Sequence, residues 1–132
     1  MPPVLVVDDD QSIRECVAEF LSFEGFEVCE ACNGEEGLRL LESERPRVVV
    51  LDLMMPVMSG WEFRREQKLR PDLADIPVIV ITASHDPDID ADRILTKPFD
   101  ADVLIDAVHE AAWRSPAEDP LGGSSILTDR EA

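Results

Sequence analysis

The sequence predicts an α/β protein: a doubly wound parallel sheet of five strands with helices on both faces. Short apolar runs without polar alternation recur along the chain, which is typical of strands buried on both faces. Segments with apolar residues at helical spacing separate these runs, and strands that alternate with helices form βαβ units with right-handed crossovers. The 132 residues are enough for one domain with a real core.

The first half of the chain contains three of the five expected strands. Ser12 is the expected N-cap of the first helix, with Glu15 as its capping-box partner. Gly25 ends that helix, and Pro46 closes off the second. The expected elements are a strand at 4–7, a helix from 12 to 24, a strand at 26–31, a helix at 35–44 and a strand at 48–51 that leads into Asp52.

The second half contains two shorter strands and a long amphipathic helix. Residues 85–92 hold four Asp and few apolar positions, so we expect a short, irregular or mobile fourth helix there. From Ser115 onward no amphipathic period remains, so residues 1–114 form the predicted domain and residues 115–132 a flexible acidic tail. The expected elements are a helix at 61–69, strands at 77–81 and 94–96, and a helix at 99–114.

The net charge of −17 limits the classes of partner. Direct binding to nucleic acid or to an anionic membrane needs a basic surface, which this composition argues against. No apolar run approaches the ~18 residues that a membrane span requires. The Met1-Pro2-Pro3 start has no basic segment, so we expect no signal peptide and a cytoplasmic protein. Metal cations and basic protein surfaces remain suitable partners.

Polar side chains follow the predicted strands at the points where the strands end. Asp8 and Asp9 follow the first strand, Asp52 the third, Thr82 the fourth and Lys97 the fifth. Parallel strands present their carboxyl ends at one edge of the sheet, where ligands of open α/β sheets bind. The sequence therefore predicts that three carboxylates, a hydroxyl and an amine converge at one edge.

This set of residues indicates phosphoryl chemistry. Clustered carboxylates repel one another unless a cation lies among them, and oxygen ligands suit Mg²⁺. A carboxylate can also attack phosphorus to give an aspartyl phosphate. A phosphoryl group on Asp52 would need Mg²⁺, the Lys97 ammonium and the Thr82 hydroxyl around it. Asp10 has two open readings, a further metal ligand or the start of the first helix, where the helix dipole favours an anion.

Four motifs, in this order along the chain, resemble the receiver domain of two-component response regulators. The resemblance covers Val4 to Arg114. It implies a flavodoxin-like sheet with strand order 2-1-3-4-5, in a stand-alone domain like the chemotaxis regulators. The motifs are Val4-Leu5-Val6-Val7-Asp8-Asp9-Asp10, Leu51-Asp52-Leu53-Met54-Met55-Pro56 with Gly60, Ile81-Thr82-Ala83, and Lys97-Pro98-Phe99.

The resemblance implies a phosphoacceptor and a metal site. Asp52 matches the phosphoacceptor and one of the Mg²⁺ ligands. Asp9 matches a direct Mg²⁺ ligand, and Asp8 matches one that acts partly through water. The backbone carbonyl of Met54 matches a further ligand. We therefore expect Mg²⁺ as the cofactor.

The resemblance also implies the residues that respond to the phosphoryl group, and the partners. Thr82 matches the hydroxyl that moves to the phosphoryl group, Lys97 matches the amine that bonds a phosphoryl oxygen, and the Lys97–Pro98 peptide matches a cis bond. A sensor histidine kinase or a histidine phosphotransfer protein would donate the phosphoryl group, and an unidentified downstream protein would receive the signal. We expect a protein that accepts and hydrolytically loses a phosphoryl group, not a turnover enzyme.

Two departures from the family concern the readout of the signal. Only 14 residues separate Thr82 from Lys97, about seven fewer than is typical, or roughly two helical turns. Ile94 stands where the family has Tyr or Phe. A receiver-fold module that binds proteins independently of phosphorylation is therefore the alternative. An aspartyl-phosphate phosphatase or phosphotransferase is disfavoured, because Met54 stands where that class has a second carboxylate.

Overall fold

The computed structural model describes residues 2–84 and 87–114. These alternate between strand and helix as the sequence predicts, except that the described residues between the last two strands contain no helix. The predicted tail, residues 115–132, lies outside the described residues. No helix among the described residues is long and apolar enough to cross a membrane. In chain order the elements are β1 (Val4–Val7), α1 (Gln11–Phe23), β2 (Val28–Ala31), α2 (Gly34–Glu44), β3 (Val48–Asp52), α3 (Gly60–Lys68), β4 (Val78–Thr82), β5 (Arg93–Thr96) and α4 (Ala101–Arg114).

The five strands form one parallel sheet in the order β2-β1-β3-β4-β5, so the predicted fold class and strand order are confirmed. The register pairs Val7 of β1 with Leu51 of β3, and Asp52 with Ile81 of β4. The residue after β1 therefore lies beside the last residue of β3. This register brings the carboxyl ends of the three central strands level with one another.

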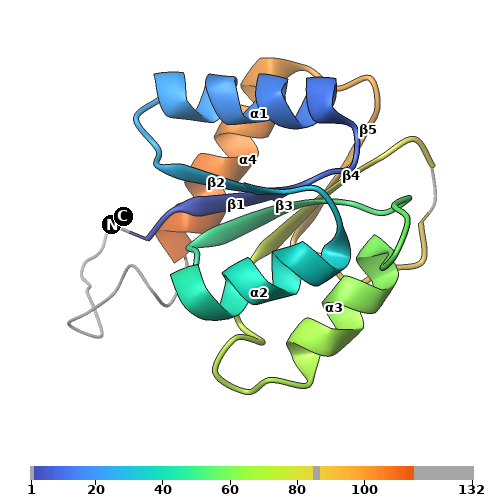
Figure 1. Cartoon of the computed structure of the whole chain (residues 1–132). Helices are drawn as coiled ribbons and strands as arrows, with labels where there is room; N and C mark the ends of the chain where they lie inside the picture. Colours follow the sequence, from blue (N-terminus) through green and yellow to red (C-terminus); the bar gives the residue numbers. More distant parts are fainter. Residues whose placement is uncertain (1, 85–86, 115–132) are drawn as a thin grey trace.

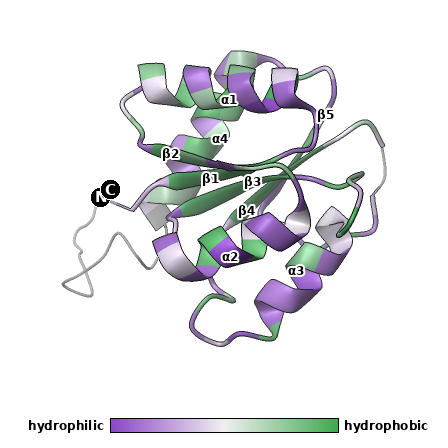
Figure 2. Cartoon of the chain, viewed as in Figure 1, coloured by the Kyte–Doolittle hydropathy of each residue, from purple (hydrophilic) through white to green (hydrophobic). Residues whose placement is uncertain are grey.

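Two helical layers cover the sheet, with α1 and α4 on one face and α2 and α3 on the other (Figure 1). Successive side chains along a strand pack alternately into the two cores. Val4 and Val6 pack in the core under α1 and α4, whereas Leu5 and Val7 pack in the core under α2 and α3. Apolar residues line the sheet between the layers, and the outer helix surfaces are largely hydrophilic (Figure 2). Burial of strand residues on both faces explains the unbroken apolar runs.

The N-cap of the first helix lies two residues before the predicted one, so the helix begins earlier than the sequence predicts. Asp10, not Ser12, is the N-cap of α1, and its side chain accepts a hydrogen bond from the backbone N–H of Ile13 at 3.2 Å. Asp10 thus begins the helix, one of the two readings left open for it. Both residues suit an N-cap. The Asp10 position is selected because the chain turns directly after Asp9.

The short or irregular helix expected between the fourth and fifth strands does not form in the described residues 83–84 and 87–92, which have no helical turn. Ten residues, 83–92, connect β4 to β5. A crossover between parallel strands usually needs a dozen or more residues when it contains a helix. An extended chain covers more distance per residue than a helix, which accords with the lack of a helical turn in the described residues of this short connection.

Side chains of α3 hold the extended crossover in place. The indole N–H of Trp61 donates to the carbonyl oxygen of Asp88 at 3.1 Å, and Arg64 Nε donates to the carbonyl oxygen of Asp90 at 2.7 Å. Lys68 Nζ lies 3.1 Å from the Asp90 carboxylate. These three α3 residues, spaced three and four apart, share one helical face. That face of α3 binds the crossover.

A buried glutamine links the same helix to the loop before β4. Gln67 is fully buried, and its amide N–H group donates to the carbonyl oxygens of Leu73 and Ile76 at 2.9 and 3.0 Å. Its amide oxygen accepts a hydrogen bond from Arg64 Nη1 at 2.7 Å. Arg64 is therefore fixed between Gln67 and the crossover, and all three segments are joined in one polar network.

Candidate functional site

The structure brings the five predicted site residues to the carboxyl edge of the sheet. Asp8 and Asp9 directly follow β1, Asp52 is the last residue of β3, Thr82 is the last residue of β4, and Lys97 directly follows β5. β1, β3 and β4 are hydrogen-bonded neighbours. The side chains that the sequence places after separate strands therefore meet in one region.

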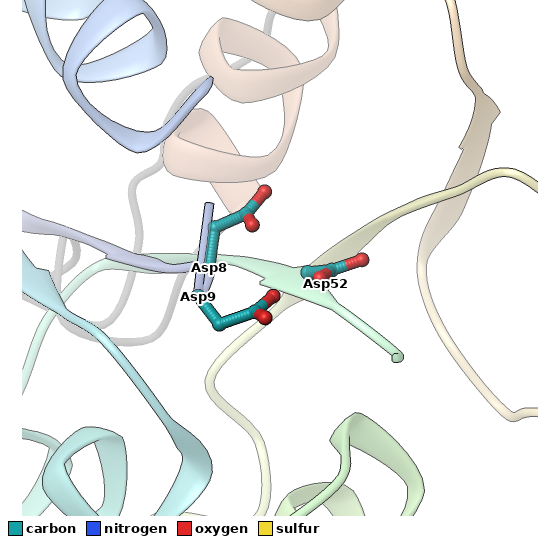
Figure 3. A group of neighbouring side chains, drawn as sticks. All are labelled: Asp8, Asp9 and Asp52. Atoms are coloured by element: carbon teal, nitrogen blue, oxygen red, sulfur yellow. The ribbon is translucent and has the colours of Figure 1, made fainter. Parts of the chain in front are cut away.

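Three carboxylates form the centre of this region. Asp8 and Asp52 are buried and Asp9 is exposed, and one ligand oxygen from each lies within 4.8 Å of the other two. Figure 3 shows the three side chains projecting from the ends of β1 and β3 into the same space. Within the described residues, no other group of three or more acidic, His or Cys side chains has this spacing. Oxygen donors at this separation suit a hard divalent cation such as Mg²⁺.

Lys97 places a positively charged side chain beside this cluster. Its Nζ lies 3.4 Å from Asp52 Oδ1 and 3.6 Å from Asp8 Oδ2. Its backbone N–H donates to the carbonyl oxygen of Thr82 at 2.7 Å, which fixes the start of its loop against β4. The Lys97–Pro98 peptide is cis, as the resemblance implies. One ammonium therefore bridges two of the three carboxylates.

Burial makes the carboxylates at this edge less acidic. The pKa of Asp52 is raised to about 6: burial is the largest cause, the neighbouring Asp8 carboxylate adds to it, and the Lys97 ammonium opposes it. Burial also raises the pKa of Asp8, against the opposing effects of the Asp10 backbone N–H and Lys97. At neutral pH Asp52 is mostly ionised, which is the form that acts as a nucleophile.

Thr82, at the end of β4, and Met54 complete the set of predicted site residues. Thr82 is fully buried, and its hydroxyl accepts a hydrogen bond from the backbone N–H of Ser84 at 3.1 Å. In this structure the hydroxyl thus contacts the beginning of the crossover. Met54 lies in the loop after β3 with its side chain exposed, and the role of its carbonyl as a metal ligand stays a prediction.

The loop after Asp52 returns closely to the strand it leaves. The backbone N–H of Gly60 donates to the carbonyl oxygen of Leu53 at 2.9 Å. A Cβ atom on Gly60 would overlap the carbonyl oxygen of Asp52 and lie 2.8 Å from the Cα of Leu53. Ser59 and Glu62 then begin α3 with a capping box. Glycine at position 60 allows the loop to close against Asp52, a role that the sequence analysis did not assign to it.

Sequence analysis also missed Arg14, which contacts the backbone of the acidic pair. Arg14 Nη1 donates to the carbonyl oxygen of Asp8 at 2.9 Å, and Nε donates to Glu30 Oε1 at 3.2 Å. The only signal in the sequence is a basic residue one helical turn after the cap of the first helix. That signal is weak, because most arginines on a helix surface are solvated.

Fold and site together define a class: a doubly wound α/β domain with a cluster of three carboxylates and one lysine at the carboxyl edge of its sheet. A family model described as the response regulator receiver domain matches residues 4–109. The chain belongs to this family of two-component response regulators.

Individual relatives agree with this assignment. Response regulator MprA of Mycolicibacterium vanbaalenii is 38% identical, over 95% of this chain and 56% of that protein. Transcriptional regulatory protein AfsQ1 of Streptomyces coelicolor is 35% identical, over 100% of this chain and 61% of that protein. The chain thus spans a little more than half the length of these curated relatives.

Solved structures show the same fold. Chemotaxis protein CheY4 of Vibrio cholerae is 31% identical, with a TM-score of 0.78 over 84% of this chain and 98% of that chain. Response regulator TrrA of Thermotoga maritima, solved in complex with Mg²⁺ and BeF, is 36% identical, with a TM-score of 0.75 over 84% of this chain and 99% of that chain. At these identities the likeness extends beyond the fold to the family.

Proposed function

We propose that this chain is a phosphoacceptor receiver in a His–Asp phosphorelay, phosphorylated on Asp52 with the help of Mg²⁺. The observation that carries the proposal is the position of Lys97 Nζ, 3.4 Å from Asp52 and 3.6 Å from Asp8, beside a carboxylate cluster whose ligand oxygens lie within 4.8 Å of one another. One fixed cation and room for a divalent ion suit a dianionic phosphoryl group.

The chemistry of the proposed step follows from these side chains. A carboxylate oxygen of Asp52 attacks the phosphorus of a phosphohistidine, the P–N bond breaks, and its electron pair goes to the leaving imidazole. Lys97 lies where it can bond an oxygen of the transferred group. Asp8, Asp9 and Asp52 would hold Mg²⁺, which would neutralise phosphoryl charge during transfer. Attack by water on phosphorus would later return the Asp52 carboxylate and release inorganic phosphate.

The proposed function also implies partners and a location for this domain. A sensor histidine kinase or a histidine phosphotransfer protein donates the phosphoryl group, and a downstream protein reads the modified domain by direct contact. The net charge of −17 supports protein contact over nucleic-acid or membrane contact for this domain, and a cytoplasmic location accords with a kinase partner. As a carrier of one phosphoryl group, the domain would not act as a turnover enzyme.

The test is phosphorylation with acetyl phosphate and Mg²⁺, read on phosphate-affinity gels and by intact mass. The wild-type protein should acquire one adduct that hydroxylamine removes, as expected for an acyl phosphate, and Asp52→Asn should acquire none. Asp106→Asn, which removes an exposed carboxylate from α4, is the matched control and should behave as wild type. An adduct of equal yield on Asp52→Asn would refute the proposal.

The altered crossover favours a second candidate, a protein-binding module that acts without phosphorylation. The described crossover residues are extended and bonded to α3, and Ile94 of β5 is 37% exposed. Beryllofluoride with Mg²⁺, a phosphoryl mimic, separates the two candidates in an NMR titration. A phosphorylation-driven receiver should show shifts in the amide resonances of residues 83–84 and along β5, whereas the second candidate predicts shifts confined to the carboxylate edge.

A further inference from the structure

Arg14 is the one basic side chain of α1, and it reaches back to the turn that carries the acidic pair. It lies in the first turn of the helix, and its side chain is only 15% exposed. Nη1 donates to the carbonyl oxygen of Asp8, while Nε donates to Glu30 at the end of β2. The guanidinium thus joins α1, β2 and the β1–α1 turn through one planar group.

The orientation of the Asp8 carbonyl affects where the side chains of the acidic pair point. This carbonyl carbon is bonded to the nitrogen of Asp9, so the orientation of the peptide sets where the exposed Asp9 side chain begins. The other groups of Asp8 are also held. Its backbone N–H donates to the carbonyl oxygen of Ala31 at 3.1 Å, and its Oδ1 accepts from the Asp10 N–H at 2.9 Å. Arg14 fixes the remaining polar group of Asp8.

The electrostatics of the site make this restraint necessary. Three carboxylates within 4.8 Å repel one another when ionised, and Asp9 is exposed, so repulsion can turn it toward solvent. Lys97 contacts Asp8 and Asp52. A restraint on the Asp8–Asp9 peptide therefore acts on Asp9, the third carboxylate of the cluster.

We propose that Arg14, held by Glu30, is a positioning residue for the Asp8–Asp9 pair, and that it sets the affinity of the site for a divalent cation. The inference rests on the proposed function of the cluster as a Mg²⁺ site. Groups that orient metal ligands from outside the coordination sphere typically change metal affinity by about 10- to 100-fold when they are removed. A partly buried Arg–Glu pair with a merely structural role would change the stability of the fold and leave metal affinity unchanged.

Four variants test the proposal: Arg14→Gln, Arg14→Lys, Glu30→Gln and, as a matched control, Arg39→Gln. Arg39 pairs with Glu35 at 3.4 Å on the surface of α2, and both side chains are exposed. The dissociation constant for Mg²⁺ is measured by NMR titration at about pH 7.5. The rate of phosphorylation by acetyl phosphate is measured as a function of Mg²⁺, and folding is checked by urea denaturation.

Arg14→Gln should weaken Mg²⁺ binding by about tenfold or more, while the rate at saturating Mg²⁺ stays within about threefold of wild type. Arg14→Lys, which can still donate to the Asp8 carbonyl, should recover part of the affinity, and Glu30→Gln should show a smaller loss than Arg14→Gln. Arg39→Gln should bind Mg²⁺ as wild type does.

Mg²⁺ affinity within about twofold of wild type in folded Arg14→Gln would overturn the proposal. If that variant does not fold, wild-type affinity in both Arg14→Lys and Glu30→Gln overturns it equally. Failure of the proposed function has a different signature: wild-type protein that binds Mg²⁺ but acquires no phosphoryl adduct. In that case the affinities of the Arg14 variants still decide the role of Arg14.

Discussion

Replacement of Asp52 by Asn should stabilise the fold of the metal-free protein at neutral pH. Burial raises the pKa of Asp52 from 3.8 to about 6, so the unfolded chain releases this proton at lower pH than the folded chain. Below about pH 3.8 both states hold the proton; as pH rises to about 6, the folded state loses stability. The shift corresponds to about 3 kcal/mol at about 1.36 kcal/mol per pKa unit. We therefore expect Asp52→Asn to raise the free energy of unfolding by about 2 to 3 kcal/mol.

The assay is urea denaturation of wild type and Asp52→Asn with EDTA, at about pH 7.5 and about pH 4. The gain should be present at the higher pH and largely absent at the lower one. Mg²⁺ should shrink it, because the cation binds the folded wild-type carboxylates. Asp106→Asn removes one negative charge from an exposed site and should change stability by less than about 0.5 kcal/mol. An Asp52→Asn protein no more stable than wild type at about pH 7.5 in EDTA would refute the account of the site as a cluster strained by burial and repulsion.

Three further perturbations follow from the contacts of the site and of α3. Gly60→Ala should lower the free energy of unfolding by about 2 kcal/mol or more, measured in urea, because the new Cβ overlaps the Asp52 carbonyl oxygen and backbone has little room to move. Gln67→Leu should cost about 3 kcal/mol in the same assay because it removes three buried hydrogen bonds; Gln11→Leu, at an exposed glutamine of α1, should cost less than about 0.5 kcal/mol. Lys97→Met should raise the pKa of Asp52 above about 6, because the ammonium now lowers it; carboxyl carbon NMR titration measures the change, and an unchanged or lower pKa would contradict it.

The fold and the carboxyl edge could be predicted from sequence because local patterns specify them. The run Val48 to Leu51 is apolar at every position and is followed by one carboxylate, so both the buried strand and the place where it ends are visible in the sequence. Strand–helix alternation then implies a parallel sheet, and a parallel sheet puts Asp8, Asp52 and Lys97 at the same edge. The structure places these residues there.

Features that depend on partners distant in sequence could not be predicted in the same way. Arg14 contacts Glu30, sixteen residues away, and Arg64 contacts Asp90, twenty-six residues away. A surface arginine with such a partner has the same local pattern as a solvated one. The sequence predicts Ser12 as the cap of α1 in place of Asp10, because capping propensity does not separate Ser from Asp. The lack of a helical turn in the described residues 83–84 and 87–92 reflects a limit on length, and local propensity does not reveal how far a connection must extend.

The crossover also determines which part of the molecule a modified Asp52 can influence. The Thr82 hydroxyl accepts a hydrogen bond from Ser84 N–H, at the beginning of the crossover. If Thr82 turns toward a phosphoryl group on Asp52, that bond is lost, so residues 83–84 are freed first. The later residues remain bound to α3 through Trp61 and Arg64. A change at Asp52 should therefore reach the beginning of the crossover and β5, while Asp88 and Asp90 stay bound to α3.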